Sequence, residues 1–170
     1  MSEINDRHWF ALYTKPRHEF KAELQLNNVS VDSYLPTQIV TKRWSDRKKK
    51  VTEPIFRGYI FINANEKERF LALSQSAIVR CISFIGKPSI IPDWQIDSIK
   101  KMLSEAPEVF ISDKIQIGTK VQIADGPFKD VIGVVAEEQK DKWLAVCVEL
   151  IHRSVMVRLP KESIIKILEK

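Results

Sequence analysis

The chain of 170 residues is 44% hydrophobic and 29% charged, the balance of an ordinary folded protein, and its length fits one domain or two small ones. No apolar run approaches the ~18–20 residues of a membrane span, which argues against a helical membrane protein. The net charge of +5 lies wholly in residues 1–103, with 17 Lys and Arg against 11 Asp and Glu, whereas residues 104–170 hold 10 against 11. This asymmetry indicates that the first part meets a polyanion.

Two features of the sequence predict a cytoplasmic protein. The first ten residues contain no apolar core of a secretory signal. Cys81 and Cys147 lie in apolar, strand-like runs, where free cysteines are commonly buried, and in a reducing compartment such thiols stay unpaired. We therefore expect a cytoplasmic monomer that does not contact a membrane.

The first elements are a strand and a helix. Residues 8–15 alternate between two apolar faces, which predicts a strand covered at least partly on both sides. Residues 17–29 consist of good helix formers, but Phe20 and Leu24 lie nearly opposite Ala22 on a helical projection. Either this helix is buried widely, or Phe20 and Leu24 form an exposed contact patch. The pattern favours core packing.

A basic hairpin is predicted next. Residues 32–44 form an extended segment, and residues 50–64 form its hairpin partner. Between them, six of the nine residues from 42 to 50 are Lys or Arg, with Trp44 embedded among them. We expect a mobile, basic hairpin tip.

The following segments alternate between helix and strand. Residues 65–76 predict a helix capped by Asn63 or Asn65, and residues 77–86 predict a strand that a glycine ends. A further helix begins near Asp93, with its apolar residues on one face up to position 103.

This order of elements predicts an α+β fold in two domains. Residues 1–103 read as an antiparallel sheet flanked by helices, and residues 104–113 as a linker. Residues 114–170 read as a small β-barrel of short alternating strands. The strands of this barrel are expected at residues 119–124, 131–137, 143–150 and 154–159.

Signals of catalysis and of bound cofactors are absent from the sequence. None of the three histidines pairs with a cysteine at the spacing of a metal site, and the five glycines form no phosphate-binding loop. No serine stands in a nucleophile elbow, and the acidic residues are scattered. We expect no enzymatic activity, no metal and no cofactor.

The chain resembles the NusG family of transcription elongation factors. The resemblance covers nearly the whole chain, with its motifs in the family's order. The first part is similar to the NusG N-terminal domain, and the last ~55 residues are similar to a KOW domain, which has an SH3-like barrel. The stretches that carry it are WFALYTKPRHE, EPIFRGYIFI, FIG and VQIADGPFKDVIGVVAE.

The resemblance implies a binding function in transcription. In the family, the N-terminal domain docks on the clamp helices of RNA polymerase through an apolar patch and suppresses pausing. The KOW domain recruits a second partner, such as ribosomal protein S10 or the termination factor Rho. We expect Phe56 to be the anchor of the polymerase contact, although core packing stays open for these rings, above all for Trp9 and Tyr59. The residues assigned to this contact are Trp9, Tyr13, Ile55, Phe56 and Tyr59.

Two basic segments are candidate nucleic-acid contacts. In specialised members of the family, the start of the first helix contacts the non-template DNA strand, where cations bind phosphates and a ring such as His18 or Phe20 receives a base. The hairpin tip could reach upstream DNA or the polymerase. An ordinary solvated helix face and a charged, solubilising loop are the alternatives. The assigned residues are Lys15, Arg17, His18 and Lys21 at the helix, and Arg43, Arg47, Lys48 and Lys49 at the tip.

Two departures from the family pattern indicate a specialised paralogue, of the kind that serves one set of long operons. Arg57 stands where the family often has a proline, and could pair with a polymerase acid. The turn formed by Ile151, His152 and Arg153 replaces an IFGR-like turn that contributes to the partner contact.

Two alternatives accompany this interpretation. The first is an RNA-binding or ribosome-associated KOW protein, although the charge of −1 from 10 basic and 11 acidic residues over 104–170 argues against it. The second concerns fold, since some members of the family refold the C-terminal domain into a helical hairpin. The Val- and Ile-rich residues 143–159 favour the barrel.

Overall fold

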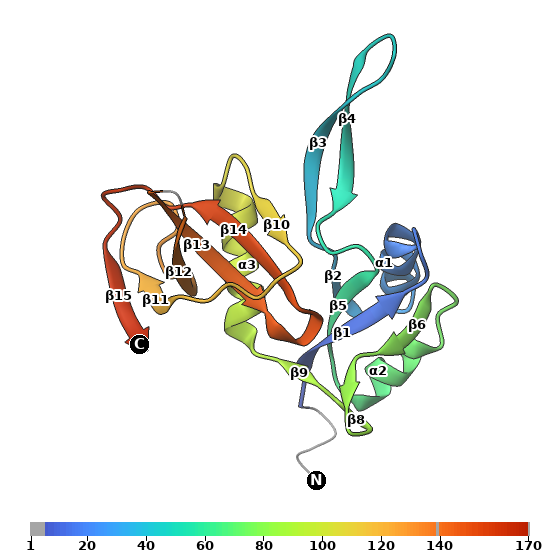
Figure 1. The fold of residues 1–170 in the computed structure, drawn as a ribbon. Coiled ribbons are helices and arrows are strands. Elements are labelled where there is room, and N and C mark those ends of the chain that lie inside the picture. The colour runs from blue at the N-terminus through green and yellow to red at the C-terminus, as the bar shows by residue number, and fades with distance from the viewer. Residues whose placement is uncertain (1–5, 139, 170) are drawn as a thin grey trace. The chain divides into compact units, whose positions relative to one another are not determined.

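The computed structural model describes residues 6–138 and 140–169. They form two compact units, which divide between Ile90 and Ile91 (Figure 1). The first combines a sheet with two helices and the second combines a helix with another sheet, so the predicted α+β class is confirmed.

The sheet of the first unit is antiparallel. Its strands are β1 (His8–Thr14), β2 (Asp32–Tyr34), β5 (Tyr59–Ala64) and β6 (Ile78–Cys81), in the order β2-β5-β1-β6, and β9 (Ile90–Ile91) also pairs with β1. In the register of β1 and β5, Tyr13 lies opposite Tyr59 and Leu12 lies opposite Ile60. Because side chains alternate along a strand, these pairs divide the residues cleanly between two faces.

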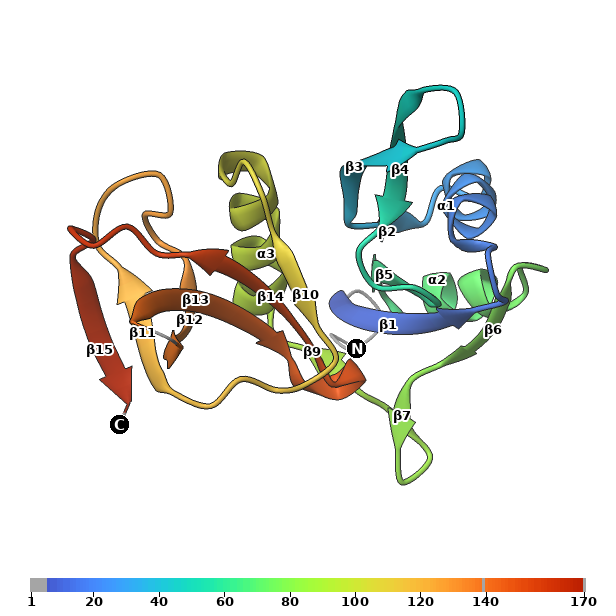
Figure 2. The same cartoon turned by 45° about the horizontal axis from the view of Figure 1, so that its top comes forward.

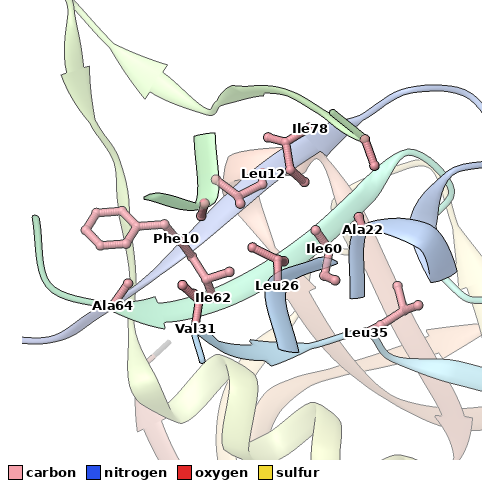
Figure 3. Packing of buried hydrophobic residues seen from close by; sticks show 12 residues of the cluster. Phe10, Leu12, Ala22, Leu26, Val31, Leu35, Ile60, Ile62, Ala64 and Ile78 are labelled. Atoms are coloured by element: carbon pink, nitrogen blue, oxygen red, sulfur yellow. The ribbon is translucent and has the colours of Figure 1, made fainter. Parts of the chain in front are cut away.

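One face of this sheet holds the hydrophobic core of the first unit. The helices α1 (Glu19–Asn28) and α2 (Glu66–Leu73) contribute Ala22, Leu26 and Ala72 to it. Figure 3 shows Ala22 and Leu26 of α1 facing the apolar side chains of the strands. The strand residues of this core are Phe10, Leu12, Ile60, Ile62, Ala64 and Ile78.

The helix α2 begins where the sequence predicts. The side chain of Asn65 accepts a hydrogen bond from the Glu68 N–H at 3.0 Å, and the Glu68 carboxylate accepts one from the Asn65 N–H at 2.9 Å. This reciprocal capping box satisfies two amide groups that the first turn of a helix leaves unpaired.

The outer side of α1 corrects a prediction. Phe20 and Leu24 are 46% and 61% exposed, so the expectation that they pack into the core is wrong. The helix contacts its sheet through one narrow stripe around Ala22 and Leu26, and the residues on the opposite side stay in solvent.

The predicted hairpin is present but shorter than expected. It consists of β3 (Thr37–Arg43) and β4 (Lys48–Pro54), and it extends away from the sheet of its own unit (Figures 1 and 2). The predicted partner strand 50–64 divides into β4 and β5, because the chain turns at Gly58, which has a φ of +85°.

The predicted strand 77–86 is likewise interrupted. After β6, a second small hairpin joins β7 (Ser83–Phe84) to β8 (Lys87–Pro88), and Figure 2 shows it extending from the end of β6. Ile85 and Gly86 both have positive φ angles, of 49° and 72°. A positive φ is rare for a β-branched residue, so the sequence gives no sign of a turn at Ile85. The apolar pattern around Ile85 therefore predicts a continuous strand.

The second unit contains α3 (Asp93–Glu105) and a six-stranded antiparallel sheet. A short 3-10 helix, η2 (Glu149–Ile151), joins two of its strands. Gly133 lies where a Cβ atom would meet the carbonyl oxygen of Ala145 at 2.5 Å, so the close pairing of its strand requires glycine. In spatial order the strands are β10 (Phe110–Ser112), β14 (Arg153–Arg158), β13 (Asp141–Val148), β12 (Ile132–Glu138), β11 (Thr119–Ile123) and β15 (Ile165–Glu169).

The boundary between the compact units differs from the predicted domain boundary. The sequence assigns the helix after residue 93 to the first domain and residues 104–113 to a linker, whereas α3 packs on β12 and β13 and β10 pairs with β14. The Ser98 hydroxyl oxygen accepts a hydrogen bond from the Ile132 N–H at 3.0 Å. Apolar periodicity identifies the buried face of a helix, but it does not identify the sheet that covers this face.

Candidate functional site

The face of the N-terminal sheet opposite the helices is aromatic. Its rings form a row of contacts: Trp9 to Tyr34 with centroids 6.5 Å apart, Tyr34 to Phe61 at 6.5 Å, and Phe61 to Phe56 at 5.9 Å. Trp9 and Phe61 reach this face because they alternate with the core residues of β1 and β5.

Three of the predicted contact residues are buried. Phe56 is only 1% exposed and its ring meets the edge of Phe61, and Trp9 and Ile55 are buried as well. The prediction that Phe56 and Ile55 form an exposed patch is therefore wrong for this structure. A backbone hydrogen bond accompanies this burial. The Ile55 N–H donates to the Pro36 carbonyl and ties the start of the turn to the segment before β3.

Among the rings named for this face, Tyr13 is exposed, with 36% of its surface in solvent. The half-buried Tyr59 meets it edge to face at 5.5 Å, and the guanidinium of Arg80 lies 5.9 Å from its ring centre. Sequence reasoning missed Arg80, although its pairing with Tyr13 across β1 and β6 follows once the strand order is known. A ring with a cation beside it suits a protein partner that offers both apolar and acidic groups.

The turn before Tyr59 carries the residue that departs from the family pattern. Arg57 is exposed and lies 3.8 Å from the carboxylate of Glu53, which Lys42 also contacts. The hydrogen bond from Lys42 lowers the pKa of Glu53. Arg57, expected from the sequence to pair with an acid of the polymerase, therefore already lies beside Glu53 of its own chain.

The cations at the start of α1 are accessible, but their geometry differs from the prediction. Lys15, Arg17 and Lys21 are exposed and His18 is half-buried. A helix over residues 17–29 would place Arg17 and Lys21 on one face, yet α1 begins only at Glu19 and Arg17 has a φ of +62°. Pro16 and this left-handed residue delay the helix, so the cations follow a loop and one helical turn.

The basic tip of the β3–β4 hairpin lies at the surface, and each of the residues 42–50 is exposed. Its register places like charges opposite each other, Lys42 against Lys49 and Arg43 against Lys48. Such cross-strand pairs destabilise a hairpin unless a counter-charge is present. Lys49 lies 5.5 Å from the ring centre of Trp44, and half of this ring stays in solvent.

The predicted partner turn of the second unit is only partly accessible. Ile151 is buried, which corrects the expectation that it contacts a partner. His152 is exposed with a φ of +51°, and Arg153 is half-buried and lies 3.2 Å from the carboxylate of Asp113. The turn of η2 directs the isoleucine inward and leaves the histidine at the surface.

Groups with the chemistry of a metal site or a reactive thiol are not found in the described part of the chain. No cluster of three His, Cys, Asp or Glu residues could hold a metal ion there. Cys81 and Cys147 are free; burial raises the pKa of Cys81, and the Ser154 hydroxyl donates to the sulfur of Cys147 at 3.2 Å. Over the same residues, the helices are too short and too polar to cross a bilayer.

Known proteins match this chain over most of its length. The transcription termination/antitermination protein NusG of Staphylococcus carnosus (strain TM300) is 24% identical, over 97% of this chain and 98% of its own length. That of Pasteurella multocida (strain Pm70) is 30% identical, over 74% of this chain and 71% of its own.

Among solved structures, one described as domain interaction in Thermotoga maritima NusG aligns with a TM-score of 0.46 and 21% identity, covering 90% of this chain and 93% of that one. The family model described as "Transcription termination factor nusG" matches residues 7–100, more than half of the sequence. The chain therefore belongs to the NusG family of transcription termination and antitermination factors.

Proposed function

We propose that this protein binds RNA polymerase through the aromatic face of its N-terminal unit, docks on the clamp helices and suppresses pausing or termination. The observation that carries the proposal is the exposed ring of Tyr13, which is supported by Tyr59 and accompanied by Arg80. Partly exposed aromatic and arginine side chains are typical anchors of protein interfaces.

The burial of Phe56 changes how this contact is built. Phe56, Trp9 and Ile55 are buried parts of this unit, and the direct contacts come from Tyr13, Tyr59 and Arg80. A coiled element of the polymerase that carries acidic groups beside apolar ones complements this surface, because Arg80 needs a counter-charge next to the ring.

The basic segments of the same unit are proposed to contact nucleic acid. Lys15, Arg17, His18 and Lys21 offer cations for the phosphates of a non-template DNA strand. The hairpin tip adds the cations of Arg43, Arg47, Lys48 and Lys49, and Trp44 offers a ring for stacking. Because Arg43 and Lys48 face each other across the hairpin, a polyanion relieves their repulsion, whereas a merely solubilising loop gains nothing from it.

The C-terminal sheet is proposed to recruit a second partner, ribosomal protein S10 or Rho, at the turn that exposes His152 beside Arg153. Because this turn departs from the family pattern, we propose an operon-specific paralogue that acts as a cytoplasmic monomer. Catalysis plays no part in this proposal.

A purified transcription assay tests the proposed function. The protein should raise run-through at pause sites, at least on templates that carry its own upstream leader, and polymerase should be retained with it from cell extract. Retention of ribosomal RNA without polymerase would instead support the ribosome-associated alternative. No effect on any template would contradict the proposal.

A further inference from the structure

We infer that Glu19 is a positioning residue for the proposed polymerase contact: its buried carboxylate fixes the turn at Gly58, on which the rings of Tyr13 and Tyr59 rest. The expected effect on polymerase binding rests on the proposed function, whereas the anchoring of Gly58 can be measured without any partner.

Glu19 occupies an unusual place for a carboxylate. It is the first residue of α1, in the middle of the cationic segment, and yet it is only 6% exposed. Burying a charged carboxylate is costly unless hydrogen bonds compensate for the lost water. Glu19 accepts a hydrogen bond from the Gly58 N–H at 2.8 Å, and the amide groups of the first helical turn also favour a negative charge there.

The peptide of Gly58 is held from both sides. Its N–H donates to Glu19, and its carbonyl accepts a hydrogen bond from the Thr14 N–H at 2.8 Å. Glycine suits this position because a φ of +85° is rarely adopted by residues with a Cβ atom. The two hydrogen bonds hold a peptide that glycine's flexibility would otherwise leave free to sample other conformations. Glu19 therefore links the start of α1 to the end of β1 through one glycine.

This glycine sets the position of the exposed rings. A Cβ atom at Gly58 would lie 3.3 Å from Cε2 of Tyr13, so the ring of Tyr13 packs directly on the glycine. Tyr59 follows Gly58 in the chain and meets Tyr13 edge to face. If the Gly58 peptide were released, both rings would lose the surface that orders them, and the interface would have to order them on binding.

The competing explanation is that Glu19 only holds α1 on the sheet and does not position the rings of Tyr13 and Tyr59. Leu26 supplies the matched control, because it also anchors α1 but does so in the core on the other face of the sheet. Substitution of Leu26 by alanine weakens the packing of α1 on the sheet without changing a residue of the Gly58 turn. The conservative variant Glu19→Gln keeps an oxygen that can accept from the Gly58 N–H.

The experiment compares Glu19→Ala, Glu19→Gln and Leu26→Ala in the full-length protein. Amide hydrogen exchange at Gly58 and the ring resonances of Tyr13 and Tyr59 are measured by NMR, and the affinity for purified core RNA polymerase is measured by titration. Glu19→Ala should accelerate Gly58 exchange and weaken polymerase binding, each by about tenfold, the effect expected for one hydrogen bond to a charged group. Glu19→Gln should stay within about twofold of the wild type, because a neutral acceptor keeps most of the bond.

The outcomes separate the inference from the proposed function. Equal Gly58 exchange in Glu19→Ala and Leu26→Ala, compared at equal global stability, would overturn the anchoring role. Faster exchange with unchanged polymerase affinity, while Tyr13→Ala weakens binding, would overturn the positioning role. If Tyr13→Ala also leaves binding unchanged, the polymerase contact itself is wrong, and the exchange data alone decide whether Glu19 anchors Gly58.

Discussion

At the scale of single residues, Phe56 is expected to contribute to the stability of the fold and not to direct contact with a partner. Its ring is almost fully buried against Phe61, so replacing it removes core packing before it removes any surface. We expect Phe56→Ala to lower the free energy of unfolding by about 3–5 kcal/mol, the usual cost of truncating a buried phenylalanine. Guanidinium denaturation of the wild type and the variant measures this difference.

A milder substitution keeps this prediction testable if the alanine variant does not fold. Phe56→Leu should lower the stability by a smaller amount, since the leucine fills part of the cavity. A change of less than about 1 kcal/mol for Phe56→Ala, within the range of ordinary surface substitutions, would mean that the ring is exposed in solution after all.

Residues in regular strands can be placed from the sequence, whereas residues in turns and pairs distant in sequence cannot. Alternation along β1 correctly separates Trp9 and Tyr13 from the core residues Phe10 and Leu12. It cannot place Phe56, because this residue lies in a turn where no period applies and the fold of the turn depends on Gly58 and Glu19. Arg80 could not be found either, since its neighbour Tyr13 is distant in sequence.

At the scale of elements, the β3–β4 hairpin has a surplus of positive charge that its own stability does not favour. We expect Lys48→Glu to raise the melting temperature of the protein slightly, because the new acid faces Arg43 across the hairpin. The same change should weaken binding to single-stranded DNA. The slope of log affinity against log salt concentration should become shallower by about 0.7 for each phosphate that the variant no longer binds.

Lys67→Glu on α2 supplies the control for this prediction, since it changes the net charge equally at an exposed position away from the hairpin. Thermal denaturation and fluorescence titrations at several salt concentrations measure the two effects. Equally weakened DNA binding in both variants would show that net charge, not the hairpin, is responsible.

The elements that the sequence predicts well are those with local signals. The cap of α2 at Asn65 depends on residues three positions apart, and the basic tip depends on composition. The failures are non-local. The sequence predicts a linker where β10 lies, because its partner β14 comes more than 40 residues later, and it does not predict β15, because the pairing of β15 with β11 closes a long loop.

At the scale of the whole molecule, the family match and the packing of the helix α3 assign this helix to different parts of the chain. The family match runs to residue 100 and includes most of this helix, whereas its packing assigns it to the second unit. We expect a fragment of residues 91–170 to be more stable than one of residues 106–170. The difference should be about 3 kcal/mol or more, because each fully buried side chain such as Ile96, Ile99 or Met102 contributes about 1.5–3 kcal/mol.

Urea denaturation of the two fragments, followed by circular dichroism, measures this difference. Equal stabilities would indicate that α3 belongs with the N-terminal domain in solution, as the predicted domain boundary has it. The second unit would then begin after the helix, close to the predicted boundary.

The N-terminal unit is proposed to bind RNA polymerase through the exposed ring of Tyr13. The proposed contacts with DNA and with a second partner take place on the polymerase and therefore depend on this one. The most direct measurement is the affinity of purified core polymerase for the wild type, for Tyr13→Ala and for Phe20→Ala, which removes a comparably exposed ring from α1. We predict that Tyr13→Ala weakens binding by about 2 kcal/mol, or roughly thirtyfold in affinity, and Phe20→Ala by no more than about twofold. Equal affinities of the wild type and Tyr13→Ala would contradict the proposed contact.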